Sequence, residues 1–205
     1  MRLEPSSGCP HARVAELRRV FAGDVDRFLR ESEPYRKSAA GRLARWSARA
    51  TPQLLAVWLY RVSHLFHARG WESVARLLFQ VNFLLHKLTI GPASCIGAGL
   101  YLPHPVGVIF HGRAGEDLTL FPQSGCLPAL PAFDGPANLG PRLGDRVSVG
   151  VHSAVVGPIN VGSDTHVGFL AILHEDAPAG SVILSHAIRN RVSFPGGPTD
   201  PRLER

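Results

Sequence analysis

His104 lies between two prolines in the segment LYLPHPVGVIFHG, residues 100–112. An imidazole titrates near neutral pH, so it can exchange a proton with a substrate or bind a metal ion. Neither a helix nor an ordinary strand accepts Pro-His-Pro in its interior, because proline donates no backbone hydrogen bond. The role of His104 therefore depends on the backbone that carries it, since a lone histidine in an apolar stretch is more often structural than catalytic.

Composition and charge divide the chain into two parts. Its 205 residues are 45% apolar and 19% charged, a globular balance with enough length for one large core and a smaller attached unit. Residues 1–87 contain 15 Lys and Arg against 7 Asp and Glu (15 − 7 = +8), whereas residues 88–205 contain 7 against 9 (7 − 9 = −2). The first part has no block of basic residues, which argues against nucleic acid as a partner.

The cysteines and the apolar segments indicate a cytoplasmic protein. Cys9, Cys95 and Cys126 form no Cys-x-x-Cys pair and are odd in number, so we expect neither a disulfide framework nor a structural zinc site. The N-terminal residues lack the apolar stretch of a signal peptide. The most apolar segments, 53–68 and 74–86, are interrupted by polar residues before they reach the ~18–20 residues of a membrane span, so we expect no transmembrane segment.

Helical spacing is confined to the residues before 88, which predicts an N-terminal α-helical domain over 1–87. One helix is predicted within 11–32, a second from Thr51-Pro52 to about residue 68, and a third over 71–87, with a connector at 33–50 that has room for a short helix at 40–48. The apolar positions of the first helix are Val14, Leu17, Val20, Phe21, Val25, Phe28 and Leu29, and those of the third are Val74, Leu77, Leu78, Val81, Leu84 and Leu85.

From residue 90 to 120, and again from 143 to 173, every sixth residue is apolar. Such a hexapeptide repeat is typical of a parallel β-helix, in which each six-residue unit forms one side of a triangular coil and directs the same aliphatic position inward. The fourth residue after a repeat start is usually small or aliphatic, as at Ser94, Val106, Ser153, Thr165 and Ala171. The repeat starts are Ile90, Ile96, Leu102, Val108, Ala114 and Leu120, then Leu143, Val149, Val155, Val161, Val167 and Leu173.

The repeats are interrupted by a loop predicted over residues 126–141, which contains four prolines and two glycines. Cys126 continues the count from Leu120, so we expect it to point inward rather than act as a nucleophile. Asp134 is the only acid in the loop and is either solvated or able to orient a ligand. The β-helical domain is predicted to span 88–184, with a last strand after 178 and a loose tail over 185–205.

This pattern places His104 at a corner of a coil. Leu102 is an inward position, and Pro103 and Pro105 occupy turn sites, where no hydrogen bond to a neighbouring strand is needed. We therefore expect His104 to point outward from a stiff corner.

Two segments, IGPASCIGAGLYLPHPVGVIF and PRLGDRVSVGVHSAVVGPINVGSDTHVG, resemble the hexapeptide-repeat acyltransferases, specifically the serine O-acetyltransferase family and its relatives in polysaccharide gene clusters. The helical segment TPQLLAVWLYRVSHLFHARGWESVARLL is similar to that family's helical domain, so the resemblance covers about residues 10–185. It implies a left-handed β-helix that assembles as a homotrimer, or as a dimer of trimers through the helical domains.

The resemblance also implies the roles of particular residues. His104 matches the general base that takes the proton of an acceptor hydroxyl as this attacks the thioester of acetyl-CoA. Gly150, Val151, Ser153 and Gly168 match residues that contact acetyl-CoA, largely through backbone, in a groove between neighbouring subunits. Acetyl-CoA is a co-substrate, and the resemblance implies no metal and no other cofactor.

Three positions depart from the serine-specific pattern. Pro103 and Thr89 stand where those members carry aspartates, and Gly140 stands where they carry a second histidine. A buried ammonium group needs an anionic partner, and two polar groups that could contact an amino acid are absent. L-serine or a serine-like substrate remains the first expectation for the acceptor, with a hydroxyl of a sugar or pathway-specific metabolite as the alternative. A non-catalytic hexapeptide scaffold protein is the third interpretation.

The remaining histidines are given structural roles. His111 is expected at a corner or an interface, with ligand contact as the alternative. His152 and His166 are expected at exposed turns or trimer contacts. A zinc site that they form with His104 would resemble the carbonic anhydrases built on the same prism, which need three converging imidazoles from adjacent subunits, and the spacings here do not reproduce that pattern.

Overall fold

The helices begin and end at the signals that the sequence carries. The computed structural model describes residues 9, 14–32, 48–129 and 140–185, and within them the helices are α1 (Val14–Glu31), α4 (Pro52–Ala68) and α5 (Glu72–His86). The Thr51 hydroxyl accepts a hydrogen bond from the Leu54 N–H at 3.5 Å, which caps α4 as predicted. α5 ends at Lys87, which adopts the left-handed conformation with φ 56°. The short helix expected at 40–48 lies almost entirely outside the described residues.

The predicted face of α1 is buried at five of its seven positions, whereas the predicted face of α5 is half-buried at three of its six positions and exposed at the other three. The side chains of Leu77, Leu84 and Leu85 are 63%, 65% and 67% exposed. α5 instead turns Ala75 and Asn82 toward α4, where two side chains donate to backbone carbonyls of the neighbouring helix: the Asn82 amide donates to the Ala56 carbonyl at 2.9 Å, and the Ser63 hydroxyl donates to the Ala75 carbonyl at 2.7 Å. The buried apolar residues of α1 are Leu17, Val20, Val25, Phe28 and Leu29. Across the described ranges, no helix is long and apolar enough to cross a membrane.

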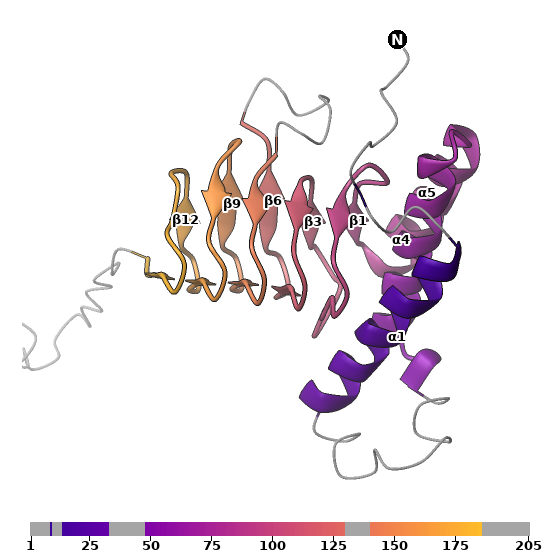
Figure 1. Cartoon of the computed structure of the whole chain (residues 1–205), viewed down its shortest axis with the longest axis horizontal. Coiled ribbons are helices and arrows are strands. Elements are labelled where there is room, and N and C mark those ends of the chain that lie inside the picture. Colours follow the sequence, from indigo (N-terminus) through magenta and orange to yellow (C-terminus); the bar gives the residue numbers. More distant parts are fainter. Residues whose placement is uncertain (1–8, 10–13, 33–47, 130–139, 186–205) are drawn as a thin grey trace, which may run out of the picture.

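Short parallel strands follow the helices and form three sheets that run the length of a β-helix. The sheet orders are β1-β3-β6-β9-β12, β2-β4-β7-β10 and β5-β8-β11-β13, and all pairs are parallel. Figure 1 shows the first sheet edge to edge, with the helices gathered beside β1 at one end. The strands are β1 (Thr89–Ile90), β2 (Cys95–Ile96), β3 (Ile109–Phe110), β4 (Arg113–Ala114), β5 (Thr119–Leu120), β6 (Gly125–Leu127), β7 (Arg142–Leu143), β8 (Ser148–Val149), β9 (Ala154–Val156), β10 (Asn160–Val161), β11 (His166–Val167), β12 (Ile172–Leu173) and β13 (Val182–Ile183).

The predicted inward stack forms the core. The repeat starts lie in one buried cluster, with Ala114 partly buried against it, and Cys126 continues the stack with 0% of its surface exposed. Burial raises the pKa of the Cys126 thiol, so this cysteine packs as an apolar group. Each buried aliphatic side chain contributes roughly 1.5–3 kcal/mol, which explains how strands of two or three residues form a stable prism.

One register prediction is wrong, and the difference concerns the segment that carries His104. Phe110, not Val108, pairs with Ile90 on one side and with Cys126 on the other. Val108 is buried at the second inward position of its coil, which the sequence assigned to Val106, and Val106 is 52% exposed. The chain therefore takes eight residues instead of six from Leu102 to the next stacked side chain. The other small residues expected at the second inward position are buried: Ser94, Ser153, Thr165 and Ala171.

The limits of the loop and the end of the prism also differ slightly from the prediction. Cys126 and Leu127 belong to β6, and residues 130–139, including Asp134, lie outside the described residues. The last strand predicted after 178 is β13, and the tail beyond 185 lies outside the described residues.

Candidate functional site

Equivalent corners of successive coils stack into a column beside the sheet that contains β5, β8 and β11. Backbone hydrogen bonds join these corners, from Gln123 N–H to Val106 O (3.2 Å), His152 N–H to Pro122 O (3.4 Å) and Leu170 N–H to Val151 O (3.1 Å). The first-coil member of this column is therefore Val106, followed by Gly107 with φ 73°. Below, we call this series of corners the corner column.

The first coil has two more residues at this corner than the coils that follow it. Pro122 comes two residues after the inward Leu120, whereas Val106 comes four residues after the inward Leu102. The added length lies within Pro103-His104-Pro105, so the corner projects beyond its neighbours.

The projecting corner is fixed by its backbone and leaves His104 exposed. The Pro103 carbonyl accepts a hydrogen bond from the Gln53 side chain of α4 at 3.3 Å, and the Pro105 carbonyl accepts one from the Val108 N–H at 3.3 Å. Pro105 is buried, and both prolines restrict φ. The structure thus places His104 where the sequence predicted it, outside the core on a stiff corner.

A groove of about 420 Å³ lies on the same sheet, beside the corner column. Its lining comes from successive coils and from α1: Tyr101, Thr119, Phe121, Ser148, Gly150, His166, Val167, Gly168 and Phe169, with Arg27 and Glu31 from the helix. Tyr101 precedes the His104 corner by three residues, and Phe121 and Phe169 belong to the corner column, so the groove and His104 share one edge of the prism.

Of the residues predicted to contact acetyl-CoA, the structure places Gly150 and Gly168 in this groove. Their N–H groups donate to the Val167 and Ile183 carbonyls at 2.8 and 2.7 Å, so the coil already uses them. A Cβ at Gly150 would lie 2.8 Å from the Val167 oxygen, so glycine allows the close approach of the neighbouring coil's backbone. Val151 is a half-buried corner residue and does not line the groove.

Ser153, the fourth of these residues, does not face the groove. Its side chain is buried, and its hydroxyl donates to the Gly150 carbonyl at 2.5 Å. It therefore holds the backbone of the corner instead of offering a hydroxyl to a ligand.

Sequence reasoning missed the polar part of the groove. His166 was expected at an exposed turn or a trimer contact. It is exposed but lies on β11, with Nδ1 2.6 Å from the Ser148 hydroxyl on the neighbouring strand. Arg27 of α1 forms ion pairs with Glu31 at 2.9 Å and with Asp117 at 3.2 Å. Strand alternation could have shown that His166 points outward, but nothing in the spacing shows that α1 reaches the sheet.

A buried ion pair fixes the helices to the first coil. Arg61 of α4 donates to both carboxylate oxygens of Asp24 on α1 at 3.0 Å, and to the carbonyls of Ile96 and Gly97. One Asp24 oxygen also accepts the N–H groups of Gly99 and Leu100, at 2.9 and 2.8 Å. Burial raises the pKa of Asp24, and the adjacent guanidinium opposes that rise.

Comparison with known proteins finds relatives that align with most of the chain. The chain is 31% identical over 157 residues to the serine acetyltransferase of Mycobacterium tuberculosis. This alignment covers 74% of this chain and 67% of that protein. It is 34% identical over 132 residues to the serine acetyltransferase of Helicobacter pylori, which covers 63% of this chain and 75% of that one. The chain belongs to the serine acetyltransferase family. No family model matches it.

Solved structures of that family share the fold. Serine acetyltransferase of Neisseria gonorrhoeae in complex with serine superposes with a TM-score of 0.71 at 18% identity and covers 84% of this chain and 68% of that one. Isoform 3 from Entamoeba histolytica in complex with cysteine has a TM-score of 0.71 at 18% identity and covers 91% of this chain, which spans 62% of the Entamoeba protein. A serine acetyltransferase complex with CoA has a TM-score of 0.69 at 18% identity and covers 82% of this chain and 67% of that chain.

The three departures from the serine-specific pattern have different structural settings. A Cβ at Gly140 would clash with the His111 carbonyl oxygen, so a side chain there would require the neighbouring backbone to shift. Thr89 is half-buried on β1, and its N–H donates to the Val108 carbonyl at 2.9 Å. Pro103 belongs to the projecting corner.

The other predicted histidines do not converge on His104. His111 follows β3 at a different corner of the coil and is partly buried, which lowers its pKa. His152 is exposed on the corner column, two coils beyond His104. Within the part of the chain that the structure describes, no group of three or more His, Cys, Asp and Glu side chains is placed to hold a metal ion.

Proposed function

We propose that the protein transfers an acetyl group from acetyl-CoA to the hydroxyl of a small acceptor, with L-serine as the first candidate. The observation that carries this proposal is the exposed His104, on a projecting corner beside a groove that contains Gly150 and Gly168. The family relationship supports the reaction type.

In the proposed reaction His104 is the general base. Its imidazole takes the proton of the acceptor hydroxyl as the oxygen attacks the thioester carbon, and the resulting tetrahedral species expels the CoA thiolate, which receives the proton from the imidazolium. A positioned imidazole supplies typically 10²–10⁴-fold, because a neutral hydroxyl is a poor nucleophile. This route needs no covalent enzyme intermediate and no metal ion.

Acetyl-CoA is assigned to the groove. Gly150 and Gly168 form its floor, Val151 is the adjacent corner, and Ser153 acts indirectly by holding the Gly150 carbonyl. Phe169 is 65% exposed and packs edge to face on Phe121 with ring centroids 6.5 Å apart, which supplies an apolar wall.

The proposal extends to assembly and location. We infer left-handed coils, a homotrimer or a dimer of trimers, a cytoplasmic location, and domains over 1–87, 88–184 and 185–205. Exposed Phe169, Ile172 and Val182 on the prism, at 65%, 68% and 63%, support packing between prisms. Exposed Leu77, Leu84 and Leu85 on α5 support contact between helical domains.

The departures favour one alternative within the same chemistry. Pro103 replaces an acid that the serine-specific pattern carries, and Gly140 stands where that pattern carries a histidine. A sugar or pathway-specific hydroxyl has no ammonium group to neutralise, so such an acceptor fits a site without these polar groups.

The test measures thiol release from acetyl-CoA with serine, homoserine and sugar acceptors. We expect His104→Ala to lose about 10²–10⁴-fold in kcat, while His174→Ala, an exposed histidine at another corner, keeps wild-type turnover. Turnover that survives His104→Ala unchanged would refute the role of this residue. Neither turnover nor acetyl-CoA binding in the wild type would instead favour a non-catalytic scaffold.

A further inference from the structure

A disulfide bond corrects the expectation drawn from the cysteine count. Cys9 is joined to Cys95 of β2, across 86 positions of sequence, while Cys126 is free and buried. Both bonded residues are nearly buried, with 7% and 9% of their surface exposed. The bond fastens residue 9, which precedes α1, to the first coil of the prism. An odd number of cysteines excludes full pairing but not one pair, and no spacing rule finds partners this far apart.

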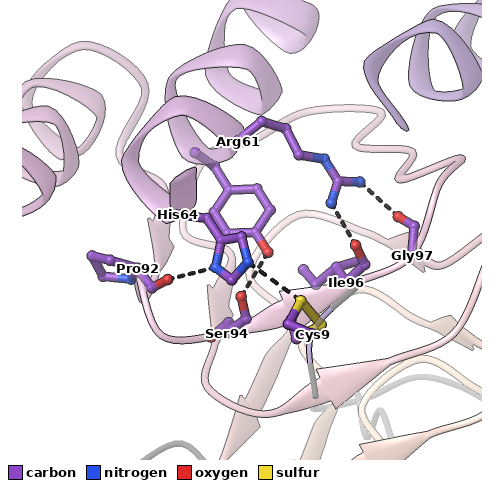
Figure 2. The surroundings of a disulfide bond; sticks show 9 residues. Cys9, Arg61, His64, Pro92, Ser94, Ile96 and Gly97 are labelled. Atoms are coloured by element: carbon purple, nitrogen blue, oxygen red, sulfur yellow. Dashed lines mark hydrogen bonds between the residues drawn. A yellow bond between two sulfur atoms is a disulfide. The ribbon is translucent and has the colours of Figure 1, made fainter. Parts of the chain in front are cut away.

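His64 of α4 lies against the sulfur of Cys9, and a second contact, with Pro92, defines which ring nitrogen of His64 carries the hydrogen. Figure 2 shows the ring between Pro92 and Cys9. Its Nδ1 is 2.8 Å from the Pro92 carbonyl oxygen, which can only accept, so Nδ1 carries a hydrogen. In the neutral ring Nε2 then presents a lone pair, and it lies 3.3 Å from the Cys9 sulfur. The side chain is 2% exposed, so this geometry is fixed by packing.

We propose that Cys9, Cys95 and His64 form a thiol–disulfide redox site, in which His64 exchanges the proton of the Cys9 thiol and the reaction partner is a dithiol or its disulfide. In oxidation, Nε2 of His64 takes the Cys9 proton, and the thiolate attacks the partner's disulfide, which leaves Cys9 in a mixed disulfide and releases one partner sulfur as a thiolate. That thiolate takes the Cys95 proton, and the Cys95 sulfur attacks the Cys9 sulfur. The S–S bond between Cys9 and Cys95 forms, and the partner's second sulfur leaves as a thiolate, which takes the proton held by His64. Reduction runs the same steps backward, with two electrons and two protons passing from the dithiol to the protein.

The setting favours reversible chemistry over a purely structural bond. Only a thiolate is nucleophilic, and a neighbouring imidazole makes one at neutral pH. In a cytoplasmic protein, disulfides that form are usually transient or redox-sensing. Cys126 is free and lies in the buried stack, where burial raises its thiol pKa, so it provides an internal reference for reactivity.

The site is placed to affect the first coil. α4 already holds the backbone around Cys95, because the Tyr60 hydroxyl donates to the Ser94 carbonyl at 2.9 Å and Arg61 donates to the Ile96 and Gly97 carbonyls. These contacts remain when the disulfide is reduced, so we expect the reduced protein to stay folded while residue 9 is released.

The experiment maps disulfides by mass spectrometry in the whole protein purified without reductant, then follows alkylation of each cysteine after reduction with dithiothreitol. We expect a linked Cys9–Cys95 peptide before reduction, and Cys9 to react before Cys95 and Cys126 afterwards. His64→Gln should slow Cys9 alkylation at pH 7 by about tenfold, as for one unit of thiol pKa.

His67→Gln is the matched control, since His67 is also buried on α4 but pairs with Glu72 at 2.7 Å. It should leave the Cys9 rate unchanged. Absence of the linked peptide would overturn the proposal, and so would equal Cys9 rates in the two variants. If His64→Gln does not fold, the order of labelling in the wild type decides, and Cys95 reacting first would overturn it. None of these measurements needs acetyl-CoA or an acceptor, so the result is independent of the proposed transferase activity.

Discussion

Replacing Arg61 by methionine should destabilise the protein severely, because it leaves a carboxylate without its counter-charge in the interior. Asp24 is 0% exposed, and Arg61 supplies two of the four hydrogen bonds that its carboxylate accepts. Methionine keeps most of the apolar stem of arginine, so the main loss is the charge and its hydrogen bonds. Removing one partner of a buried pair costs about 3–5 kcal/mol.

That cost can be measured as a shift of the melting temperature. For a chain of this size, 1 kcal/mol corresponds to roughly 2–4 °C, so Arg61→Met should lower Tm by about 6–20 °C. Wild type and variant are compared at one protein concentration and one redox state, since both assembly and the disulfide change the apparent stability.

A second substitution separates the charge from the loss of packing. Adding Asp24→Asn to Arg61→Met removes the unpaired charge but keeps an oxygen that can accept the Gly99 and Leu100 N–H groups. The double variant should therefore melt above Arg61→Met alone. A double variant that melts at or below the single one would refute the electrostatic explanation.

The pH dependence gives an independent check with a definite sign. In Arg61→Met, burial without the guanidinium raises the pKa of Asp24 further above its ordinary value of 3.8. Folding then takes up a proton, so stability is lost as the pH rises through the folded-state pKa and regained as the pH falls. The Tm difference from wild type should shrink between pH 7 and pH 5, and a difference independent of pH would count against the mechanism.

Four further changes follow from single contacts. Phe110→Ala should cost about 3–5 kcal/mol of unfolding free energy in urea denaturation, since the ring is fully buried in the stack. Gly140→Ala should cost about 1–3 kcal/mol, because its Cβ would clash with the His111 carbonyl oxygen, whereas Gly125→Ala, with only a 3.5 Å contact, should not. Phe169→Ala should raise KM for acetyl-CoA with kcat unchanged, as measured by steady-state kinetics. Burial lowers the pKa of His111, so the unfolded state binds its proton more readily; Tm should fall from pH 7 to pH 5, and by less in His111→Gln.

The inward stack of the β-helix could be predicted from the sequence, whereas the positions that depart from the repeat could not. A strict period of six identified the inward residues because every coil buries the same position against its neighbours. Val108 was assigned to the stack because both inward positions of a coil accept valine. Only the pairing of the strands shows that Phe110 occupies the stack instead. On α5, helical spacing identifies an apolar face but not its partner, so Leu84 and Leu85 were assigned to the core.

The long-range partners were also beyond the sequence. In the sequence Arg61 is one of the polar residues that interrupt the apolar segment 53–68, and nothing local pairs it with Asp24 of another helix. The disulfide bond between Cys9 and Cys95 could not be predicted for the same reason. The exposed position of His104 could be predicted because its neighbouring prolines exclude regular structure, and that argument needs only local geometry. The role of His104 as a general base is implied by the resemblance alone.

The position of His104 in the first coil follows from how a β-helix can accommodate extra residues. Adjacent strands are about 4.8 Å apart, so an insertion in an interior coil must fit between corners on both sides. The first coil has a neighbouring coil on one side only, and on the other the Lys87 carbonyl, just after α5, accepts the Gly107 N–H at 3.0 Å. Two residues can therefore be added at this corner while Leu102 and Phe110 stay in the stack. The end coil can thus carry a longer corner without disturbing the core, and the Gln53 side chain of α4 holds the Pro103 backbone of that corner.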